Sequence, residues 1–210
     1  PEYQKFMFQP HEGVVPRWIE AGSCGWRLDV ADELPVDFLR KLRAAAKAAD
    51  PEAVVLGEVW EDASNKVAYG ETRCYCTGDT LDSVMNYPFK NAVLDFVKGK
   101  PAEQAMGEIL SICEHYPAPA MDTALNFLST HDTERALTRL AGDEIGWNGK
   151  DWQAERYLNG QQYMYGISLM KCAMVLQFFL PGIPSVYYGD EAGMEGYRDP
   201  FNRRCYPWGR

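Results

Sequence analysis

The 210-residue sequence predicts an α/β fold organised around a parallel sheet. Expected strands and helices alternate along the chain, and the strands are continuous apolar runs, the pattern of strands covered by helices on both faces. Acidic residues follow three of these runs, at the end where parallel α/β folds place their chemistry. Alternation alone leaves two architectures open, a doubly wound sheet and part of a barrel.

Each expected element follows from its local pattern. Strands are expected where apolar runs of strand length occur, over 25–30, 53–59, 81–85, 124–128 and 183–187. Helices are expected over 15–20, 35–49, 91–97, 105–114, 133–140 and 162–180. Pro35 suits a first helical turn, and Pro181 with Gly182 ends the last helix. Because Lys171 and Gln177 interrupt that apolar helix, burial is a better interpretation than a membrane span.

The composition is that of a soluble globular protein, with 46% hydrophobic and 24% charged residues, and the length predicts one domain. The net charge of -9 argues against a nucleic-acid partner, because clustered Lys and Arg are needed to bind a phosphate backbone. A neutral substrate fits better. Tyr and Trp fall largely in or beside the expected loops, which suits stacking on sugar rings, although aromatic residues more often simply pack.

The six cysteines show no CxxC pair and no zinc-ligand spacing with His, so no metal site is predicted. Cys74 and Cys76 flank Tyr75 in an expected loop, and a disulfide between them is one alternative. Isolated thiols in a reducing compartment are the simpler interpretation, and they favour a cytoplasmic location. The opening residues PEYQKF contain neither a basic leader nor an apolar run, so no signal peptide is expected in them.

The segment GWRLDVADE places Asp29 at the end of a strand that also contains Arg27. Residues two apart in a strand share a face, so the guanidinium and the carboxylate are expected to point into the same space. Arg27 would then keep Asp29 ionised, as a nucleophile requires. A structural ion pair at a strand end is the alternative, and this motif alone does not decide between them.

The segment LGEVWED places Glu58 at the end of another apolar strand, with Trp60 close behind it. Such surroundings favour the protonated form of a carboxyl group, so Glu58 could donate a proton near neutrality. The alternative is an ordinary Glu that opens a polar loop, since Glu61 and Asp62 follow directly. Taken alone, this motif favours the alternative.

The segment LSTHDTER places His131 and Asp132 after a third apolar strand. His131 could donate a hydrogen bond to a sugar hydroxyl, and Asp132 could accept one. The alternative is that Asp132 is the N-cap of the next helix, with Arg135 exposed to solvent. The sequence contains no GxGxxG, P-loop or GxSxG motif, so neither nucleotide binding nor a serine hydrolase is supported.

Together and in this order, the segments resemble the α-amylase superfamily, glycoside hydrolase family 13. GWRLD is similar to the fourth-strand block, GEVW to the fifth, STHDTER to the seventh and GIPSVYYGDEAGMEG to the eighth, with LDSVMNYPF in the sixth-strand position. The resemblance implies that Asp29 is the nucleophile, that Glu58 is the acid/base and that Asp132 stabilises the transition state. It also implies that Arg27 is the invariant partner of the nucleophile and that His131 binds substrate.

The implied fold is the C-terminal half, about strands 4 to 8, of a (β/α)8 TIM barrel, with residues 1–210 forming a partial catalytic domain. The family's third-strand block, ending in Asn-His, is missing from this sequence. The N-terminal barrel half, the inserted domain B and the C-terminal β-domain are therefore expected to lie outside it. The expected partner is that remaining barrel half, with a homo-oligomer as a further option. Because half a barrel exposes strand edges and core, we expect the chain alone to be unstable or partner-dependent, and inactive.

The implied reaction is retaining hydrolysis of α-glucosidic bonds in maltodextrin, cyclodextrin or pullulan. Retention requires carboxyl groups roughly 5–5.5 Å apart, against roughly 6.5–9.5 Å for inversion. Asp32 and Glu33 occupy the place where typical α-amylases have Lys-His, which is more similar to the neopullulanase and cyclomaltodextrinase branch. The candidate rim contacts to substrate are Trp60, Asn86 and Arg135. Packing of Trp60 against its own loop is an equal alternative.

Two other functions stay open. A transglycosylase would carry the same triad and differ in excluding water. A catalytically silent glucan-binding or scaffold member usually lacks one of the acids, and all three are present here. The resemblance implies no required cofactor. Calcium, which family members often carry at the inserted domain, would bind in a region that this sequence does not contain.

Overall fold

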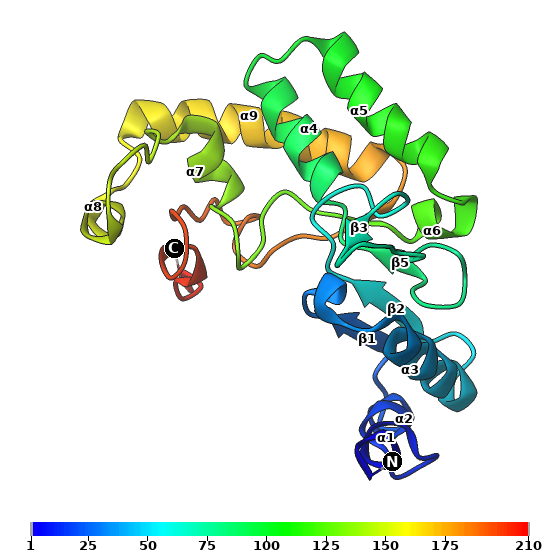
Figure 1. Ribbon diagram of the computed structural model, residues 1–210. Helices are drawn as coiled ribbons and strands as arrows, with labels where there is room; N and C mark the ends of the chain where they lie inside the picture. Colours follow the sequence, from blue (N-terminus) through cyan, green and yellow to red (C-terminus); the bar gives the residue numbers. More distant parts are fainter. Residues whose placement is uncertain (1, 210) are drawn as a thin grey trace. The chain divides into compact units, whose positions relative to one another are not determined.

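The computed structural model describes residues 2–209. Two compact units are formed, the first from the residues up to Pro88 with Ser111–Leu125, and the second from Phe89–Leu110 with the residues from Asn126 onward. Figure 1 labels most of the helices and strands of the two units.

The first unit is built on a parallel sheet in the order β1, β2, β5, formed by Gly25–Leu28, Val54–Gly57 and Ser83–Val84. Gly25 pairs with Val54 and Leu28 with Gly57, so β1 and β2 end at the same level. Beyond β5, Met85 forms a parallel bridge with Leu125. The register therefore brings the loops that follow β1 and β2 together at one edge of the sheet.

Helix α3 (Val36–Ala49) is the crossover between β1 and β2. Its residues Leu39, Leu42 and Ala46 recur at helical spacing and are buried in the same core as the strand residues Val55 and Val84. Pro35 is the N-cap of this helix, in an extended conformation, rather than a residue of the first turn.

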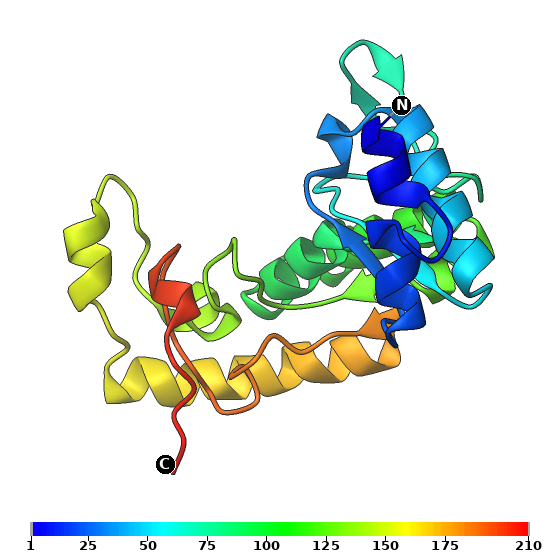
Figure 2. The ribbon, with the colours of Figure 1, turned by 90° about the horizontal axis from the view of Figure 1, so that it is seen from below.

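The other elements of the first unit lie around this βαβ arrangement. They are α1 (Glu2–Phe8), α2 (Val14–Glu20), the 3-10 helix η1 (Ala31–Glu33), α6 (Ala118–Asp122) and the antiparallel hairpin of β3 (Val67–Ala68) and β4 (Glu71–Thr72). Helices α1 and α2 pack on each other and on α3. Figure 2 shows the β3–β4 hairpin projecting from this unit.

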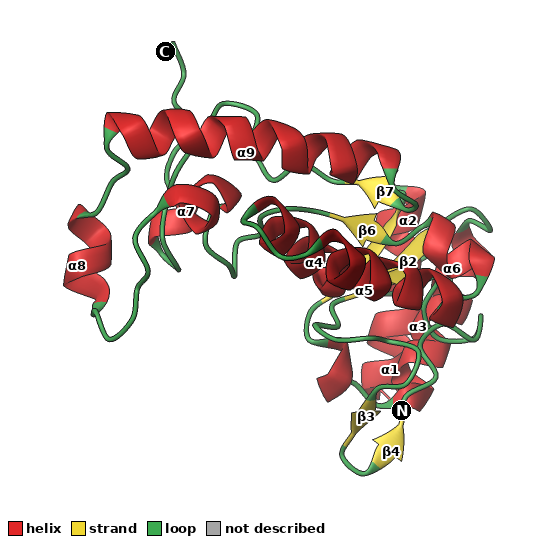
Figure 3. Cartoon of the chain, turned by 90° about the horizontal axis from the view of Figure 1, so that it is seen from above, coloured by secondary structure: helices red, strands yellow, loops and turns green. Residues whose placement is uncertain are grey.

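Strand β6 (Leu125–Asn126) pairs with β7 (Ile183–Pro184). The boundary between the units falls inside β6, so that Asn126 and β7 belong to the second unit. The helices of the second unit are α4 (Tyr87–Val97) and α5 (Ala102–His115), each in part, together with α7 (Ala136–Ala141), α8 (Lys150–Glu155), α9 (Gly160–Phe179) and the 3-10 helix η2 (Phe201–Arg203). Figure 3 shows α9 as the long straight helix that precedes β7.

Helix α9 packs closely on α7 because its residue at the contact is Gly166. A Cβ atom there would lie 2.8 Å from Leu137 Cδ1 and 2.9 Å from Ala141 Cβ, closer than real side chains approach. The helix begins with a capping box, in which Asn159 and Gln162 each accept a hydrogen bond from the other's main-chain N–H. Within the described part of the chain, no helix is both long and apolar enough to span a membrane.

The expected strands are all present, but they are shorter than the apolar runs that predicted them. Except at Met85, which keeps a bridge to Leu125, the end of each run leaves the sheet to form the loop that follows. Val30, expected to be the last residue of the first strand, has a left-handed conformation with φ of 40°. The helix expected over 133–140 begins later, at Ala136.

Candidate active site

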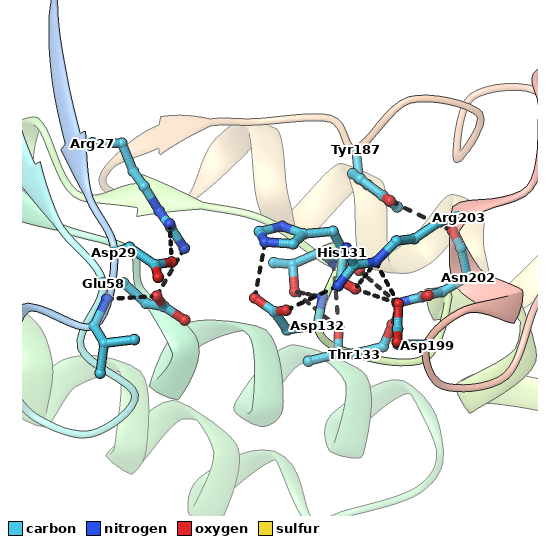
Figure 4. A network of polar contacts seen from close by, with 12 residues as sticks. Arg27, Asp29, Glu58, His131, Asp132, Thr133, Tyr187, Asp199, Asn202 and Arg203 are labelled. Atoms are coloured by element: carbon cyan, nitrogen blue, oxygen red, sulfur yellow. Dashed lines mark hydrogen bonds and ion pairs between the residues drawn. The ribbon is translucent and has the colours of Figure 1, made fainter.

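In the first unit, one guanidinium holds two carboxylates (Figure 4). Arg27, near the end of β1, donates from Nη1 to Asp29 Oδ1 at 2.6 Å. Its Nη2 lies 2.8 Å from Oε2 of Glu58, the residue that directly follows β2. The parallel register explains the geometry, because Leu28 pairs with Gly57 and the two acids follow this last pair. The expectation that Arg27 and Asp29 share a face is confirmed.

Glu58 is 5% exposed, and its carboxylate is held from three directions. Oε2 contacts Arg27 and also accepts a hydrogen bond from the Val30 amide at 3.0 Å. Oε1 accepts one from Trp60 Nε1 at 2.8 Å. A β-branched residue rarely adopts the left-handed conformation, so the backbone of Val30 is strained. In this conformation its amide points at the Glu58 carboxylate.

Asp29 differs from Glu58 in its exposure. Its side chain is 77% exposed, and its Oδ1 accepts the hydrogen bond from Arg27. The pair therefore consists of one carboxylate open to solvent and one enclosed by donors, both tied to the same cation. Such a pair can supply an accessible nucleophile and a held acid/base, the two roles that glycoside hydrolysis requires.

Trp60 has a fixed orientation. Its ring stacks on Tyr87, the first residue of α4, with centroids 4.4 Å apart and planes 12° apart, and its N–H is bonded to Glu58. About half of its surface is exposed. It therefore packs on a helix rather than on its own loop, and it leaves a free aromatic surface beside Glu58.

Asn86 and Arg135 do not have the exposed position expected of rim contacts. Asn86 is buried, and its main-chain N–H donates to Leu125 O at 3.0 Å. Arg135, for which the sequence also left open a solvent-exposed position, has no exposed surface at all. In the second unit its guanidinium carbon lies 4.4 Å and 4.6 Å from the ring centroids of Tyr187 and Tyr188. Arg135 therefore packs inside the second unit and does not form the substrate contact that was expected at the rim of the site.

The Arg135 guanidinium also pairs with a buried acid, since its Nη1 lies 3.2 Å from Asp190 Oδ1. Burial raises the pKa of Asp190 to about 6, although hydrogen bonds from Ser129 and Arg135 favour the ionised form. Arg135 occupies the N-cap position of α7, and Asp132 lies three residues before it, so the N-cap role considered for Asp132 is wrong.

His131 and Asp132 lie in the loop between β6 and α7 of the second unit, and both are partly exposed (Figure 4). His131 Nε2 lies 3.1 Å from Asp132 Oδ2, and Arg203 Nη2 lies 3.5 Å from Oδ1. Arg203 also pairs with Asp199 at 2.7 Å. Arg203 and Asn202 were not among the predicted site residues, and their only signal in the sequence is the basic stretch NRRCYPW.

The six thiols are free, so no disulfide joins Cys74 to Cys76. Over residues 2–209, no cluster of three or more His, Cys, Asp or Glu side chains is placed to hold a metal ion.

The chain is similar to α-glucan-acting enzymes over nearly its whole length. The model of the alpha-amylase catalytic domain matches residues 2–208. A cyclomaltodextrinase of Thermoanaerobacter pseudethanolicus is 41% identical, over 99% of this chain and 30% of the relative. An amylopullulanase of Thermoanaerobacter thermohydrosulfuricus is 39% identical, over 90% of this chain and 12% of the relative.

Among solved structures, the native form of the Nostoc punctiforme debranching enzyme has a TM-score of 0.77 and 29% identity, over 100% of this chain and 40% of that one. The chain thus spans less than half the length of these proteins. The parallel strands, with acids at their carboxyl ends, agree with the family match. The chain belongs to the α-amylase family, and its fold is a part of that family's catalytic barrel, about strands 4 to 8.

Proposed function

We propose that the protein containing this chain hydrolyses α-glucosidic bonds in starch-type oligo- or polysaccharides, with retention of the anomeric configuration. Membership of the family and the activities named for its relatives support the reaction class. The observation that carries the residue assignment is the Arg27 guanidinium bound to both Asp29 and Glu58.

In the proposed mechanism, Asp29 attacks the anomeric carbon and forms a glycosyl ester as the bond to the leaving oxygen breaks. Glu58 gives its proton to that oxygen, so the leaving sugar departs as an alcohol. Glu58, now a carboxylate, takes a proton from water as the water oxygen displaces Asp29 from the sugar. This proton restores the acid form of Glu58, and Asp29 leaves as a carboxylate, so both groups regain their starting state.

The shared cation supports retention rather than inversion. Retaining enzymes hold their carboxyl groups roughly 5–5.5 Å apart, whereas inverting enzymes separate them by roughly 6.5–9.5 Å to admit water. Two carboxylates bound to the two terminal nitrogens of one guanidinium lie near each other, which favours the shorter range of separations. Arg27 also opposes protonation of Asp29, which keeps the nucleophile ionised.

The remaining roles follow from family membership. Asp132 is proposed to accept hydrogen bonds from sugar hydroxyls as positive charge develops on the ring, and His131 to donate one. Arg203 and His131 each contact one of the two Asp132 oxygens and so orient the carboxyl group. Trp60 is proposed as a sugar-stacking surface because half of its ring is free.

Three further proposals complete the assignment. The reaction needs no cofactor, since it uses only carboxyl groups and water. The partner is the rest of a catalytic domain, because the relatives are more than twice as long as this chain. The location is the cytoplasm, which the free thiols support.

The test compares the protein, in the full length that its gene encodes, with its Glu58→Gln variant on maltotetraose, pullulan and a cyclodextrin. We expect loss of the acid/base to reduce kcat by roughly 10²–10⁴-fold, and the wild type to release α-anomers. Glu61→Gln is the matched control, because this neighbouring acid is largely exposed and is expected to be dispensable. Release of β-anomers would contradict retention, and an unchanged rate for Glu58→Gln would contradict the assignment. Transfer to sugars in place of water would identify a transglycosylase.

A further inference from the structure

The loop that carries His131 and Asp132 has no regular secondary structure to hold it. It runs from the end of β6 at Asn126 to the start of α7 at Ala136. The main-chain carbonyls of such a segment cannot be paired in a helix or a sheet, so their partners have to come from elsewhere. The position of Asp132 therefore depends on which groups bind the carbonyls beside it.

Two side chains donate to these carbonyls: Arg203 Nε binds His131 O at 3.0 Å, and Asn202 binds the carbonyls on both sides of Asp132. Asn202 Nδ2 donates to His131 O at 2.7 Å and to Thr133 O at 2.7 Å, with Thr130 O at 3.4 Å. An amide nitrogen has two protons, so the two short contacts use its full donor capacity. The carbonyls of residues 131 and 133 lie on either side of Asp132, and Asn202 thus fixes the main chain before and after it (Figure 4).

Asn202 is itself held in place. It is completely buried in η2, and its main-chain carbonyl accepts a hydrogen bond from Arg135 Nε at 3.0 Å. Arg135 is enclosed by Tyr187, Tyr188 and Asp190. The donor that positions the loop therefore belongs to a buried polar network, which resists displacement more than a surface side chain does.

We propose that Asn202 is a positioning residue for the reaction: its amide sets where His131 and Asp132 stand when they bind the sugar. This inference rests on the proposed function, in which Asp132 acts most strongly on the transition state. A displacement of about 1 Å in such a group can cost on the order of 10²-fold in rate. Loss of the Asn202 donors should therefore lower kcat much more than it changes KM.

The test uses Asn202→Ala and Asn202→Asp in the full-length protein. The Asp variant keeps the side-chain volume and replaces the donor by an acceptor, so it also covers the case in which a cavity prevents the Ala variant from folding. We expect kcat on maltotetraose to fall on the order of 10²-fold, with KM changed less than about threefold. Full kcat in a folded variant would overturn the proposal.

Gln177→Ala is the matched control. Gln177 is also a buried amide, and its Nε2 donates to two main-chain carbonyls, Asn126 O at 3.1 Å and Ser185 O at 2.8 Å. Its loss also removes a buried amide that donates to two main-chain carbonyls, but these carbonyls lie outside the loop over 130–133. We expect this variant to melt at a lower temperature but to keep its kcat per folded molecule. An equal loss of kcat in both variants would reduce Asn202 to a general structural role.

A double-mutant cycle tests whether Asn202 acts through Asp132. In an Asp132→Asn background, Asn202→Ala should cause little further loss of kcat, because the group that it positions is already disabled. A further loss of the same size as in the wild type would show that Asn202 acts independently of Asp132. Should Asp132→Asn alone leave the rate unchanged, the proposed function would fail rather than this inference.

Hydrogen exchange gives a readout without activity. The amides of residues 130–134 should exchange faster in Asn202→Ala than in the wild type or in Gln177→Ala. Unchanged exchange in this segment would overturn the proposal even if the protein cleaves no glucan.

Discussion

At the residue scale, the geometry of Arg27 explains how two acids of different character can share one site. Asp29 is open to solvent, whereas Glu58 is enclosed by Arg27, the Val30 amide and the Trp60 indole. A planar guanidinium holds two carboxylates in fixed directions through two nitrogens, whereas the single ammonium nitrogen of a lysine does not fix their directions.

We therefore expect Arg27→Lys to lower kcat/KM for maltotetraose by about 10²-fold or more while the protein stays folded. Arg43→Lys is the matched control. Arg43 lies on α3, its Nη2 contacts Asp82 Oδ1 at 2.8 Å, and the residue has no proposed part in the reaction. Steady-state kinetics and a thermal melt of both variants make the comparison. A full rate in Arg27→Lys would contradict a shared role for the two guanidinium nitrogens.

Lys90 gives a prediction about pH. Burial, aided by the positive charge of Arg139, lowers the pKa of Lys90 to about 8 from its usual value of 10.5. The folded state thus disfavours the charged form of Lys90, and below about pH 8 the protein carries the full loss of stability that this causes. The stability is recovered as the pH rises from about 8 towards 10.5, the pKa of the unfolded state, because in this range only the unfolded state binds the proton.

Lys90→Met should consequently raise the free energy of unfolding at pH 7 by on the order of 1–3 kcal/mol, and this gain should shrink between pH 8 and 10. Denaturant unfolding of the two proteins at several pH values measures it. Lys98→Met is the control, since Lys98 is exposed directly after the C-terminal end of α4 and should show no such trend. A gain that stays constant up to pH 10 would refute the role of the buried charge.

At the scale of elements, the sequence predicted what local pattern controls. Apolar runs of strand length identified β1, β2, β5, β6 and β7, helical spacing identified α3, and a long apolar run identified α9. Because neighbouring parallel strands end at one edge, Asp29 and Glu58 could be expected to meet, and the register of β1 with β2 brings them to the same cation. Their chemical roles came from the family resemblance, not from periodicity.

Elements that depend on distant contacts were missed. The β3–β4 hairpin contains no apolar run, and residues around it are held by the loop after Asp29. Tyr75 donates to Asp32 Oδ1 at 2.5 Å, and Lys66 Nζ lies 3.2 Å from Asp32 Oδ2. For Arg135 the sequence left open a solvent-exposed position in the helix expected over 133–140. Its burial depends on Tyr187, Tyr188 and Asp190, which lie more than fifty residues away in the sequence.

At the scale of the whole molecule, α9 presents an apolar surface that supports the proposed partner. Apolar residues occur on every side of the helix, which is typical of a helix buried all round. Nevertheless Tyr165, Phe178 and Phe179 are 60%, 55% and 85% exposed. The relatives, more than twice as long as this chain, contain additional chain that can cover such a surface.

We therefore expect the 210-residue chain on its own to melt broadly, at a temperature that depends on its concentration, because exposed apolar surface favours association. Replacing Tyr165, Phe178 and Phe179 by Ser should have opposite effects in the two contexts. The isolated chain should become more soluble, whereas the full-length protein should lose stability, since the same side chains would be buried there. Scanning calorimetry at several concentrations, with sedimentation, distinguishes these cases. A cooperative, concentration-independent melt of the isolated chain would mean that its exposed α9 face is a tolerated surface, and the proposed partner would then be unnecessary for folding.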